Sequence, residues 1–329
     1  MNRRLGLTSW LLMCITLLGQ RSMTAEEAQP LSMSLDKFQE LSAPDQRALL
    51  AAVFQRRLDL ANNVYVDSTR WNTVHKYRGG QIGAEDTKGT FRRFRHWRLD
   101  NSYRMDTDTH TEREAAEPVQ TVSSGFDAEK GVGRYTVKEP PSARGGGRID
   151  TVHDPITESN RYAYWLDGEF PHPENYLFRY LLDHQQEWDI EVPAEGDKVA
   201  LSVPWQPWFS EEPLGERRLL LDPQKGFLPV EGHSRWDRTL GSGKPSWRVE
   251  DFVVEESQLV ADVWMPTKLG ERVWASSVAD KIAVYEIEAT DFQFGTVTPE
   301  DLRVPFTEGM DIVDAVQGVG YVADGQGNP

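Results

Sequence analysis

The most constraining feature of this chain is a long succession of extended, aromatic-rich segments separated by short turns. Thr121–Phe126 and Gly133–Lys138 flank a turn at Asp127–Gly131, as the two strands of a hairpin do. The 11 Trp, 13 Phe and 10 Tyr residues favour strands and large buried or grooved aromatic surfaces. Consecutive strands with short connections form antiparallel meanders, so we expect a mainly β (α+β) protein with a large curved antiparallel sheet.

A second hairpin is predicted from Trp247–Val254 and Gln258–Met265 across a turn at Glu255–Ser257. Gly79–Gly89 is expected to be a turn and Pro140–Gly147 a loop. The other predicted strands are Val64–Tyr77, Thr90–Arg98, Tyr103–Thr109, Lys198–Val203, Arg217–Asp222, Gly226–Trp236, Glu271–Ser277 and Lys281–Phe294.

Two stretches have helical periodicity instead. A helix is predicted to begin at Ser42, with Pro44 in its first turn, and to end near Asn62–Asn63, after a short helical turn at residues 34–41. A second helix is predicted over residues 173–188, with Pro173 in its first turn.

The N-terminus has the pattern of a secretory signal. Arg3 and Arg4 precede an apolar run at Trp10–Leu18, and small residues follow up to Ala25. We therefore expect residues 1–25 to be a cleaved signal peptide, 26–33 a flexible leader, 34–322 one domain and 323–329 a flexible tail. This predicts an exported protein, periplasmic or extracellular, without an integral membrane span; a buried N-terminal element is the alternative.

Cys14 is the only cysteine and lies inside this apolar run. Lipid attachment at Cys14 is an alternative to ordinary cleavage, although a lipoprotein signal needs a small residue where Met13 stands. After ordinary cleavage the chain has no disulfide and no thiolate metal site.

Charge and motifs exclude several function classes. The formal charge is −16, which repels phosphate backbones, so no nucleic-acid partner is expected. The sequence has no phosphate-binding glycine loop, no HExxH pair and no Gly-x-Ser-x-Gly elbow. Seven scattered histidines do not have metal-ligand spacing and are interpreted as surface or hydrogen-bonded side chains, so no metal and no cofactor is predicted.

The run Phe91–Arg98 interleaves basic and aromatic residues. The period of a strand places Phe91, Arg93, Arg95 and Trp97 on one face and Arg92, Phe94, His96 and Arg98 on the other. We interpret it mainly as a strand whose arginines pair with acidic neighbours. A strand that recognises anionic headgroups at the mouth of a groove is the alternative.

Two further clusters leave a structural and a functional interpretation open. The Pro-rich segment Val203–Ser210 carries Trp205 and Trp208, and is either a lid over the core or a lid that contacts a ligand. Asp106 and Asp108 share one face of a predicted strand, which suits either a solvated acidic face or the carboxylate pair of a hydrolase.

The layout as a whole resembles that of the outer-membrane lipoprotein carrier-like superfamily, which includes periplasmic lipoprotein carriers and the N-terminal domain of an envelope-stress sensor. The resemblance is carried by Leu221–Glu231 and Val263–Pro266. Phe306–Asp314, with Gly318, Gly320 and Tyr321, is similar to the tail of an uncharacterised bacterial exported branch.

The resemblance implies an unclosed half-barrel with helices packed in its concave face, and a groove that holds acyl chains. The leading hypothesis is therefore a non-enzymatic binding protein for a lipid, a lipoprotein acyl chain or another amphiphile. Its alternatives are an envelope interaction or scaffold module with a protein partner and a filled core, and, ranked last, the hydrolase. Aromatics proposed to line the concave face are Trp97, Tyr103, Phe178, Trp188, Trp205, Trp208, Trp236, Trp264 and Trp274.

Overall fold

A computed structural model describes residues 32–78, 81–113, 115, 117–139, 145–151, 177–193, 196–205, 212–239, 245–276 and 280–324. The predicted signal peptide with Cys14, most of the leader, Trp208, the start of the second predicted helix and the end of the tail lie outside these residues.

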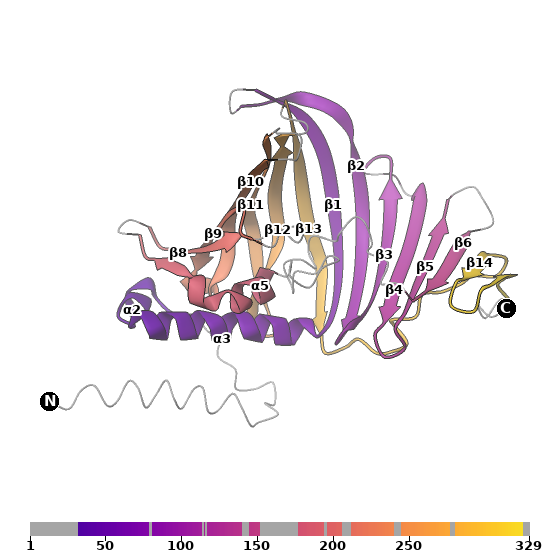
Figure 1. The fold of residues 1–329 in the computed structure, drawn as a ribbon, viewed down its shortest axis with the longest axis horizontal. Coiled ribbons are helices and arrows are strands. Elements are labelled where there is room, and N and C mark those ends of the chain that lie inside the picture. The colour runs from indigo at the N-terminus through magenta and orange to yellow at the C-terminus, as the bar shows by residue number, and fades with distance from the viewer. Residues whose placement is uncertain are drawn as a thin grey trace. The chain divides into compact units, whose positions relative to one another are not determined.

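One sheet contains the fifteen strands of the described residues, in the order β15-β14-β6-β5-β4-β3-β2-β1-β13-β12-β11-β10-β9-β8-β7 (Figure 1). All neighbouring strands are antiparallel except β14 and β6, which are parallel. The strands are β1 Asn63–Arg78, β2 Gln81–Leu99, β3 Ser102–His110, β4 Gln120–Asp127, β5 Val132–Lys138, β6 Gly146–Asp150, β7 Asp189–Glu191, β8 Val199–Trp205, β9 Gly215–Asp222, β10 Leu228–Thr239, β11 Pro245–Val260, β12 Val263–Ala275, β13 Lys281–Phe294, β14 Asp311–Asp314 and β15 Val319–Val322.

The expected fold class is confirmed: the protein is mainly β, with a large, mostly antiparallel, unclosed sheet and few helices. The hairpin of β4 and β5 has the predicted turn. The predicted strand at Thr90–Arg98 is longer than expected, because β2 begins at Gln81 and pairs with β1 from Arg78 onward. The predicted turn at Gly79–Gly89 is therefore wrong beyond residue 80.

Another predicted turn is also wrong. Glu255–Ser257 lies within β11, and the chain reverses at Ala261–Asp262 instead. Both residues of this turn have positive φ, 47° and 63°. A two-residue turn with that backbone matches the twist of the strands it joins, which is why β11 and β12 pair up to Val260 and Val263.

Three described helices accompany the sheet. Helix α2 spans Leu35–Gln39, α3 spans Ala43–Ala61 with Ser42 as its N-cap, and α5 spans Leu177–Asp183. The prediction for α3 is confirmed to within one residue, because the capping serine and Pro44 define its start. Two 3-10 turns complete the described elements, η2 at Gln185–Glu187 and η3 at Pro223–Lys225.

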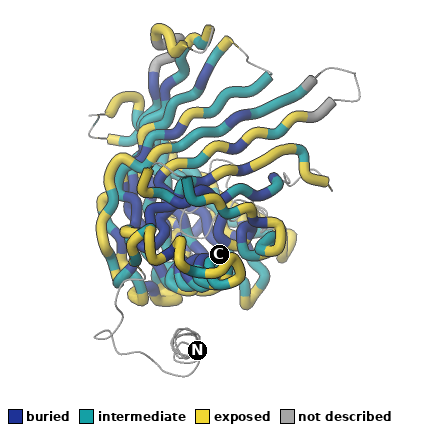
Figure 2. Tube along the Cα trace, turned by 90° about the vertical axis from the view of Figure 1, so that its left-hand side faces the viewer, coloured by how far each residue is buried: buried dark blue, intermediate teal, exposed yellow. Residues whose placement is uncertain are grey.

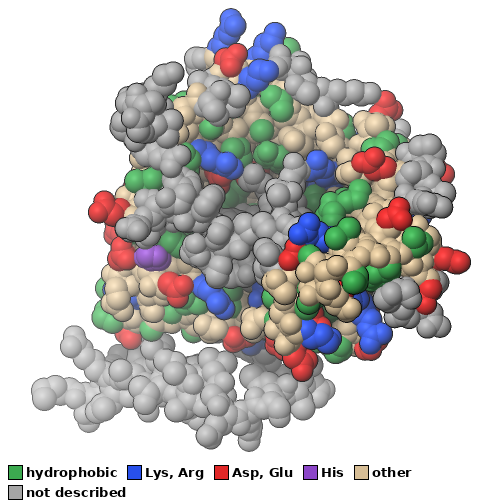
Figure 3. All heavy atoms as spheres, turned by 45° about the vertical axis from the view of Figure 1, so that its right-hand side comes forward, with side chains coloured by type: hydrophobic (Ala, Val, Ile, Leu, Met, Phe, Trp, Pro, Cys, Tyr) green, Lys and Arg blue, Asp and Glu red, His purple; other side chains and the backbone are tan. Residues whose placement is uncertain are grey.

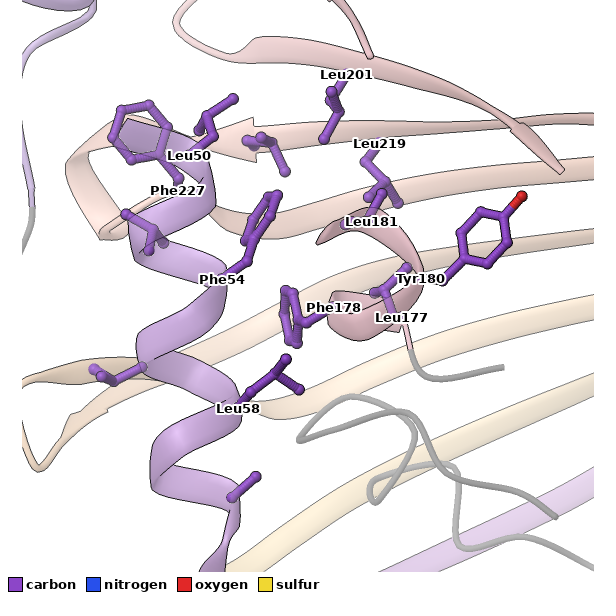
Figure 4. Packing of buried hydrophobic residues seen from close by; sticks show 14 of the residues in the cluster. Leu50, Phe54, Leu58, Leu177, Phe178, Tyr180, Leu181, Leu201, Leu219 and Phe227 are labelled. Carbon is purple, nitrogen blue, oxygen red and sulfur yellow. The ribbon is translucent and has the colours of Figure 1, made fainter. Parts of the chain in front are cut away.

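The main core lies between these helices and one face of the sheet, here called the inner face. Phe54 of α3 stacks on Phe178 of α5, with ring centroids 5.3 Å apart. Figure 4 shows Phe54 and Leu58 pointing toward Phe178. Leu201 and Leu219 of the sheet belong to the same cluster and are fully buried. Buried residues gather where the helices lie, as Figure 2 shows.

The opposite, outer face carries a crossing segment between β13 and β14. Val297 exchanges two hydrogen bonds with the side chain of Asn63. Farther along, Arg104 donates to the carbonyl of Asp301, and the guanidinium of Arg134 lies 5.6 Å from the Phe306 ring. This segment carries the chain from the centre of the sheet to β6, where β14 pairs in parallel.

Arg57 joins α3 to Trp264 of β12 and to Gly226, between η3 and β10. Its guanidinium donates to the carbonyl of Trp264 at 2.8 Å and to that of Gly226 at 3.4 Å, and it lies 5.6 Å from the Phe178 ring. Burial lowers the pKa of Arg57 from its usual value to about 9. The charge is therefore held by these carbonyls and the ring.

We predict that Arg57→Ala lowers the free energy of unfolding by about 2–4 kcal/mol, because it leaves buried carbonyls without a donor and a cavity beside Phe178. Arg56→Ala, one residue earlier and less buried, is the matched control and should change it by about 0.5 kcal/mol or less. Urea unfolding measures both, and equal effects would contradict the role given to Arg57.

Candidate functional site

A cleft of about 260 Å³ lies where α3, α5 and β2 meet. Helix α3 supplies three of its lining side chains and its C-cap a fourth, β2 supplies one and α5 supplies three. They are Gln55, Leu58, Asp59, Asn62, Arg98, Arg179, Leu182 and Asp183.

The cleft has a buried floor and an exposed rim. Leu58 and Arg98 are each 8% exposed, whereas Asp59, Arg179 and Asp183 are exposed. Leu58 belongs to the main core cluster, and Leu182 packs against it. The cleft therefore passes from a charged entrance to the apolar interior.

The local chain path explains how β2 reaches this cleft. The N–H of Asp100, in the turn between β2 and β3, donates to the carbonyl of Asn62 at 2.6 Å. The Nε of Arg98 donates to the carbonyl of Asp100 at 2.7 Å. The C-terminal cap of α3 and the end of β2 are thereby held together, with the Arg98 guanidinium beside them.

The two faces predicted for Phe91–Arg98 are confirmed by register. On β1, Val66 belongs to the main core and lies opposite His96, so Arg92, Phe94, His96 and Arg98 face inward. On the outer face Arg93 forms an ion pair with Asp67, and Arg95 donates to Asp108 at 2.8 Å. The outer arginines pair with acidic neighbours, as interpreted from the sequence, while the end of the inner row lines the cleft.

His96 lies buried on the inner face of β2 and not at the surface. It is 8% exposed, and its Nδ1 has no hydrogen-bond partner in the described part of the chain. Burial, with the charge of Arg98 as a second cause, lowers the pKa of His96 to about 3. The imidazole is therefore neutral at physiological pH.

The predicted ligand-binding aromatics occupy several environments. Phe178, Trp188 and Trp205 are buried in the main core cluster; Trp236 packs against that cluster, and Tyr103 is buried on the inner face of β3. Trp208 lies outside the described residues. None of the eight described aromatics lines the cleft.

Three of these aromatics lie on the outer face rather than in the predicted concave lining. Trp97 stacks near Tyr65, with centroids 5.1 Å apart. Trp264 and Trp274 alternate with the core residues Val263, Met265 and Leu269 along β12. The sequence indicates strands at these positions but does not fix which face of each strand is inward.

Trp188 and Trp205 are held by specific contacts. The Nε1 of Trp188 donates to the carbonyl of Leu181 at 2.7 Å, and its ring packs edge-on against Phe54. The Arg217 guanidinium lies 3.6 Å from the centroid of the Trp205 ring. These contacts agree with the core-lid interpretation of Trp205.

The two carboxylates considered for a hydrolase are engaged in hydrogen bonds. Asp106 forms an ion pair with Arg104 at 2.5 Å. Asp108 accepts from Arg95 and from the hydroxyl of Thr121, both at 2.8 Å. Both lie on the outer face of β3, which is also where Arg104 donates to the crossing segment.

The described residues contain no group of three or more His, Cys, Asp or Glu side chains that could hold a metal ion. Among the helices described, none is both long and apolar enough to cross a membrane. Acidic and basic side chains are interspersed over the face seen in Figure 3.

Comparisons with known proteins add a structural likeness. No protein-family model matches the chain, and no curated protein matches it. The structure is similar to a DUF1329 family protein. That crystal structure, from Desulfovibrio piger ATCC 29098, has 12% sequence identity and a TM-score of 0.39, covering 84% of this chain and 100% of the other. PNGF-II has 8% identity and a TM-score of 0.23, covering 78% of this chain but only 32% of its own length.

Sequence reasoning missed Asp59, Arg179 and Asp183 as site residues. The sequence carries only a weak signal for these cleft residues. Each predicted helix has an aspartate next to a leucine, at Leu58–Asp59 and at Leu182–Asp183. That signal does not reveal that the two helix ends meet.

The pKa of His96 predicts a pH-dependent stability. The folded value, about 3, lies below the ordinary value of 6.5, so the unfolded state binds more protons between these two pH values. The contribution of neutral His96 to the free energy of unfolding is therefore complete above about pH 6.5. It is lost as the pH falls toward 3, and the free energy of unfolding then changes by up to about 1.4 kcal/mol per pH unit. His96→Phe should remove this part of the slope.

The measurement is urea unfolding of wild type and variants at several pH values between 7.5 and 4.5. Carboxylates also make the free energy of unfolding depend on pH, so the contribution of His96 is the difference between wild type and His96→Phe. His233→Gln is the control, since the His233 side chain is 54% exposed. A wild-type slope retained in His96→Phe would show that His96 is not the group responsible.

Proposed function

We propose that this protein is an exported, non-enzymatic binding protein that holds a lipid, a lipoprotein acyl chain or another amphiphile. The single observation that carries the proposal is the cleft between the helices and the inner face of β2. Its charged rim leads to Leu58 and Leu182, which belong to or pack on the apolar core. An amphiphile has the same polarity gradient along its length.

The proposal places the headgroup at the cleft and the apolar part toward the core. The volume of about 260 Å³ is near the lower end of small-molecule pockets, which suits a headgroup with the first part of a chain. A longer chain requires α5 to move relative to α3, because Phe54 and Phe178 close the space behind Leu58.

The sequence resemblance to the lipoprotein carrier-like superfamily supports the same proposal, since its members hold acyl chains in a concave face covered by helices. The predicted signal peptide supports export. The resemblance and the signal peptide are features of the sequence and are independent of the cleft.

The second candidate is an envelope interaction or scaffold module with a filled core. It is favoured by the complete burial of Phe38, Phe54 and Phe178, which fill the space between helices and sheet. For such a module the cleft is a surface depression, and a protein partner replaces the small ligand.

Native mass spectrometry of the purified exported chain, before and after solvent extraction, distinguishes the two candidates. A discrete adduct of lipid mass that extraction removes supports the binding protein. A clean ligand-free mass over several preparations, with no uptake of added fatty acids or lysolipids, favours the filled-core module.

We predict that Leu182→Trp lowers lipid uptake at least tenfold, because the larger ring occupies the cleft where Leu182 lines it. Leu259→Trp is the control, because Leu259 is 46% exposed on β11, outside the cleft lining. Titration with a fluorescent fatty acid measures both, and thermal melting verifies folding. Unchanged uptake by a folded Leu182→Trp variant would remove the cleft from the proposal.

A further inference from the structure

Exposed apolar side chains gather on the C-terminal hairpin of the sheet, which β14 and β15 form. Of the eight large hydrophobic side chains that are exposed in the described part of the chain, four lie on this hairpin. They are Val313, Val316, Val319 and Val322, which are 47–57% exposed. Val313 lies opposite Gly320, two residues before Val322, so Val313 and Val322 share one face. Such a concentration of exposed apolar side chains is typical of an interaction surface.

The same hairpin ends the sheet with an open edge. Among the described strands β15 is the last in the sheet order, and it pairs only with β14. The N–H of Ala323 donates to the carbonyl of Met310 at 2.8 Å, so the backbone of Ala323 is directed toward the β14 side. Successive residues of a strand direct their N–H and C=O groups to opposite sides, so those of Gly320 and Val322 face the open edge.

The two edges of the sheet differ in their protection against pairing. At the other edge, β7 carries the exposed residues Asp189 and Glu191. Charged side chains of this kind keep an edge strand from pairing with other chains. The β15 edge, next to β14 at the opposite end of the sheet in Figure 1, has the sequence Val-Gly-Tyr-Val and carries no charge. It therefore lacks the protection that β7 has.

Gly320 leaves room for another backbone at this edge. A Cβ atom added there would meet only the carbonyl oxygen of Ile312 within 4 Å, at 3.7 Å, so the packing of the protein itself does not require a glycine. A glycine inside a strand often marks a place where another backbone approaches closely. Here it also leaves a gap beside Val313 and Val322, into which a side chain of an incoming strand can pack.

The charges around the hairpin indicate which kind of strand fits. Residues 304–324 contain four acidic residues and no lysine or arginine. Asp311 is exposed and lies opposite Val322, on the face that also carries Val313. A segment whose apolar residues are flanked by basic ones complements both the patch and its charge. A second copy of the chain fits less well, because pairing two β15 strands would bring two acidic hairpins together.

We propose that the open edge of β15 binds an extended segment of a partner protein, in which apolar β-branched residues are flanked by lysine or arginine. The segment adds a strand to the sheet, with main-chain hydrogen bonds to Gly320 and Val322 and apolar contacts to Val313 and Val322. The lining of the cleft comes from α3 with its C-cap, α5 and β2, so this surface is separate from it. The inference therefore does not depend on lipid binding at the cleft.

The experiment is titration of the exported chain into a fluorescent peptide, Lys-Lys-Val-Thr-Val-Thr-Val-Lys, followed by fluorescence anisotropy. We expect saturable binding that weakens as salt is added. The same peptide with glutamate in place of each lysine should bind at least tenfold more weakly. Val322→Lys should weaken the basic peptide at least tenfold, because it replaces an apolar contact with a like charge at the edge.

The matched control is Val253→Lys, which makes the same substitution at a valine that is 49% exposed on β11, inside the sheet order rather than at its edge. It should leave the affinity for the basic peptide unchanged. Thermal melting verifies that each variant is folded. If Val322→Lys does not fold, Val313→Lys replaces it, since Val313 is 56% exposed on the same face of the hairpin.

Hydrogen exchange tests the main-chain contacts directly. The amides of Gly320 and Val322 are followed by NMR in protein labelled with isotopic nitrogen in glycine and valine. At saturating peptide their exchange should slow at least tenfold, because an added strand takes up both N–H groups. The amide of Gly131, in the turn between β4 and β5, is the internal control and should exchange as before.

Each other outcome overturns a stated part of the inference. Absence of peptide binding, or binding that Val322→Lys leaves unchanged, overturns the site. Equal affinity for the basic and acidic peptides overturns the chemistry given to the partner. Binding without slower exchange at Gly320 and Val322 overturns strand addition. Self-association of the chain in sedimentation, abolished by Val322→Lys, assigns the edge to a second copy instead. Fatty-acid uptake should be unaffected by Val322→Lys, so the lipid proposal stands or falls separately.

Discussion

Helix α3 lies across the inner face of an open sheet, and the rest of the structure depends on this contact. A sheet with one apolar face must cover it, and an unclosed sheet cannot do so with its own strands alone. Phe54 and Leu58 bury the helix against α5 and the strands, and Arg57 attaches it to the carbonyls of Trp264 and Gly226. The position of α3 also determines where its C-terminal end meets α5, and so where the cleft forms.

Burial of charge distinguishes the interior of this acidic protein. Its inner face and helices bury Arg57, Arg98 and Arg217 together with the neutral His96. Charged groups in such surroundings are held by backbone carbonyls, hydroxyls and aromatic rings, as the contacts of Arg217 with Ser234 and Trp205 show. Such an interior differs from a purely apolar acyl-chain groove. Its buried guanidinium groups are the physical reason for proposing a charged headgroup at its border.

Much of the fold could be predicted because local chemistry specifies it. The Ser42 cap and Pro44 define α3, and alternating side chains define the strand at Phe91–Arg98. The reversal at Ala261–Asp262 could not be predicted from the sequence. Both residues adopt positive φ, but neither is a glycine or an asparagine. The cleft could not be predicted either, since Arg98, Asp59 and Asp183 come from three elements that meet only after the sheet curves.

The pairing of β1 with β13 also constrains the order in which this protein folds. Val64 lies opposite Phe294, so the first and last long strands of the sheet are neighbours at its centre. Hairpins on either side, such as β2–β3 and β11–β12, join residues close in sequence and can form early, whereas closing this central pair must wait for nearly the whole chain. Until then β1 and β13 each present a free edge to other chains, so the interval before closure is when the protein is most exposed to aggregation. A helper that shields strand edges during that interval would raise the yield of folded protein without any effect on its final stability.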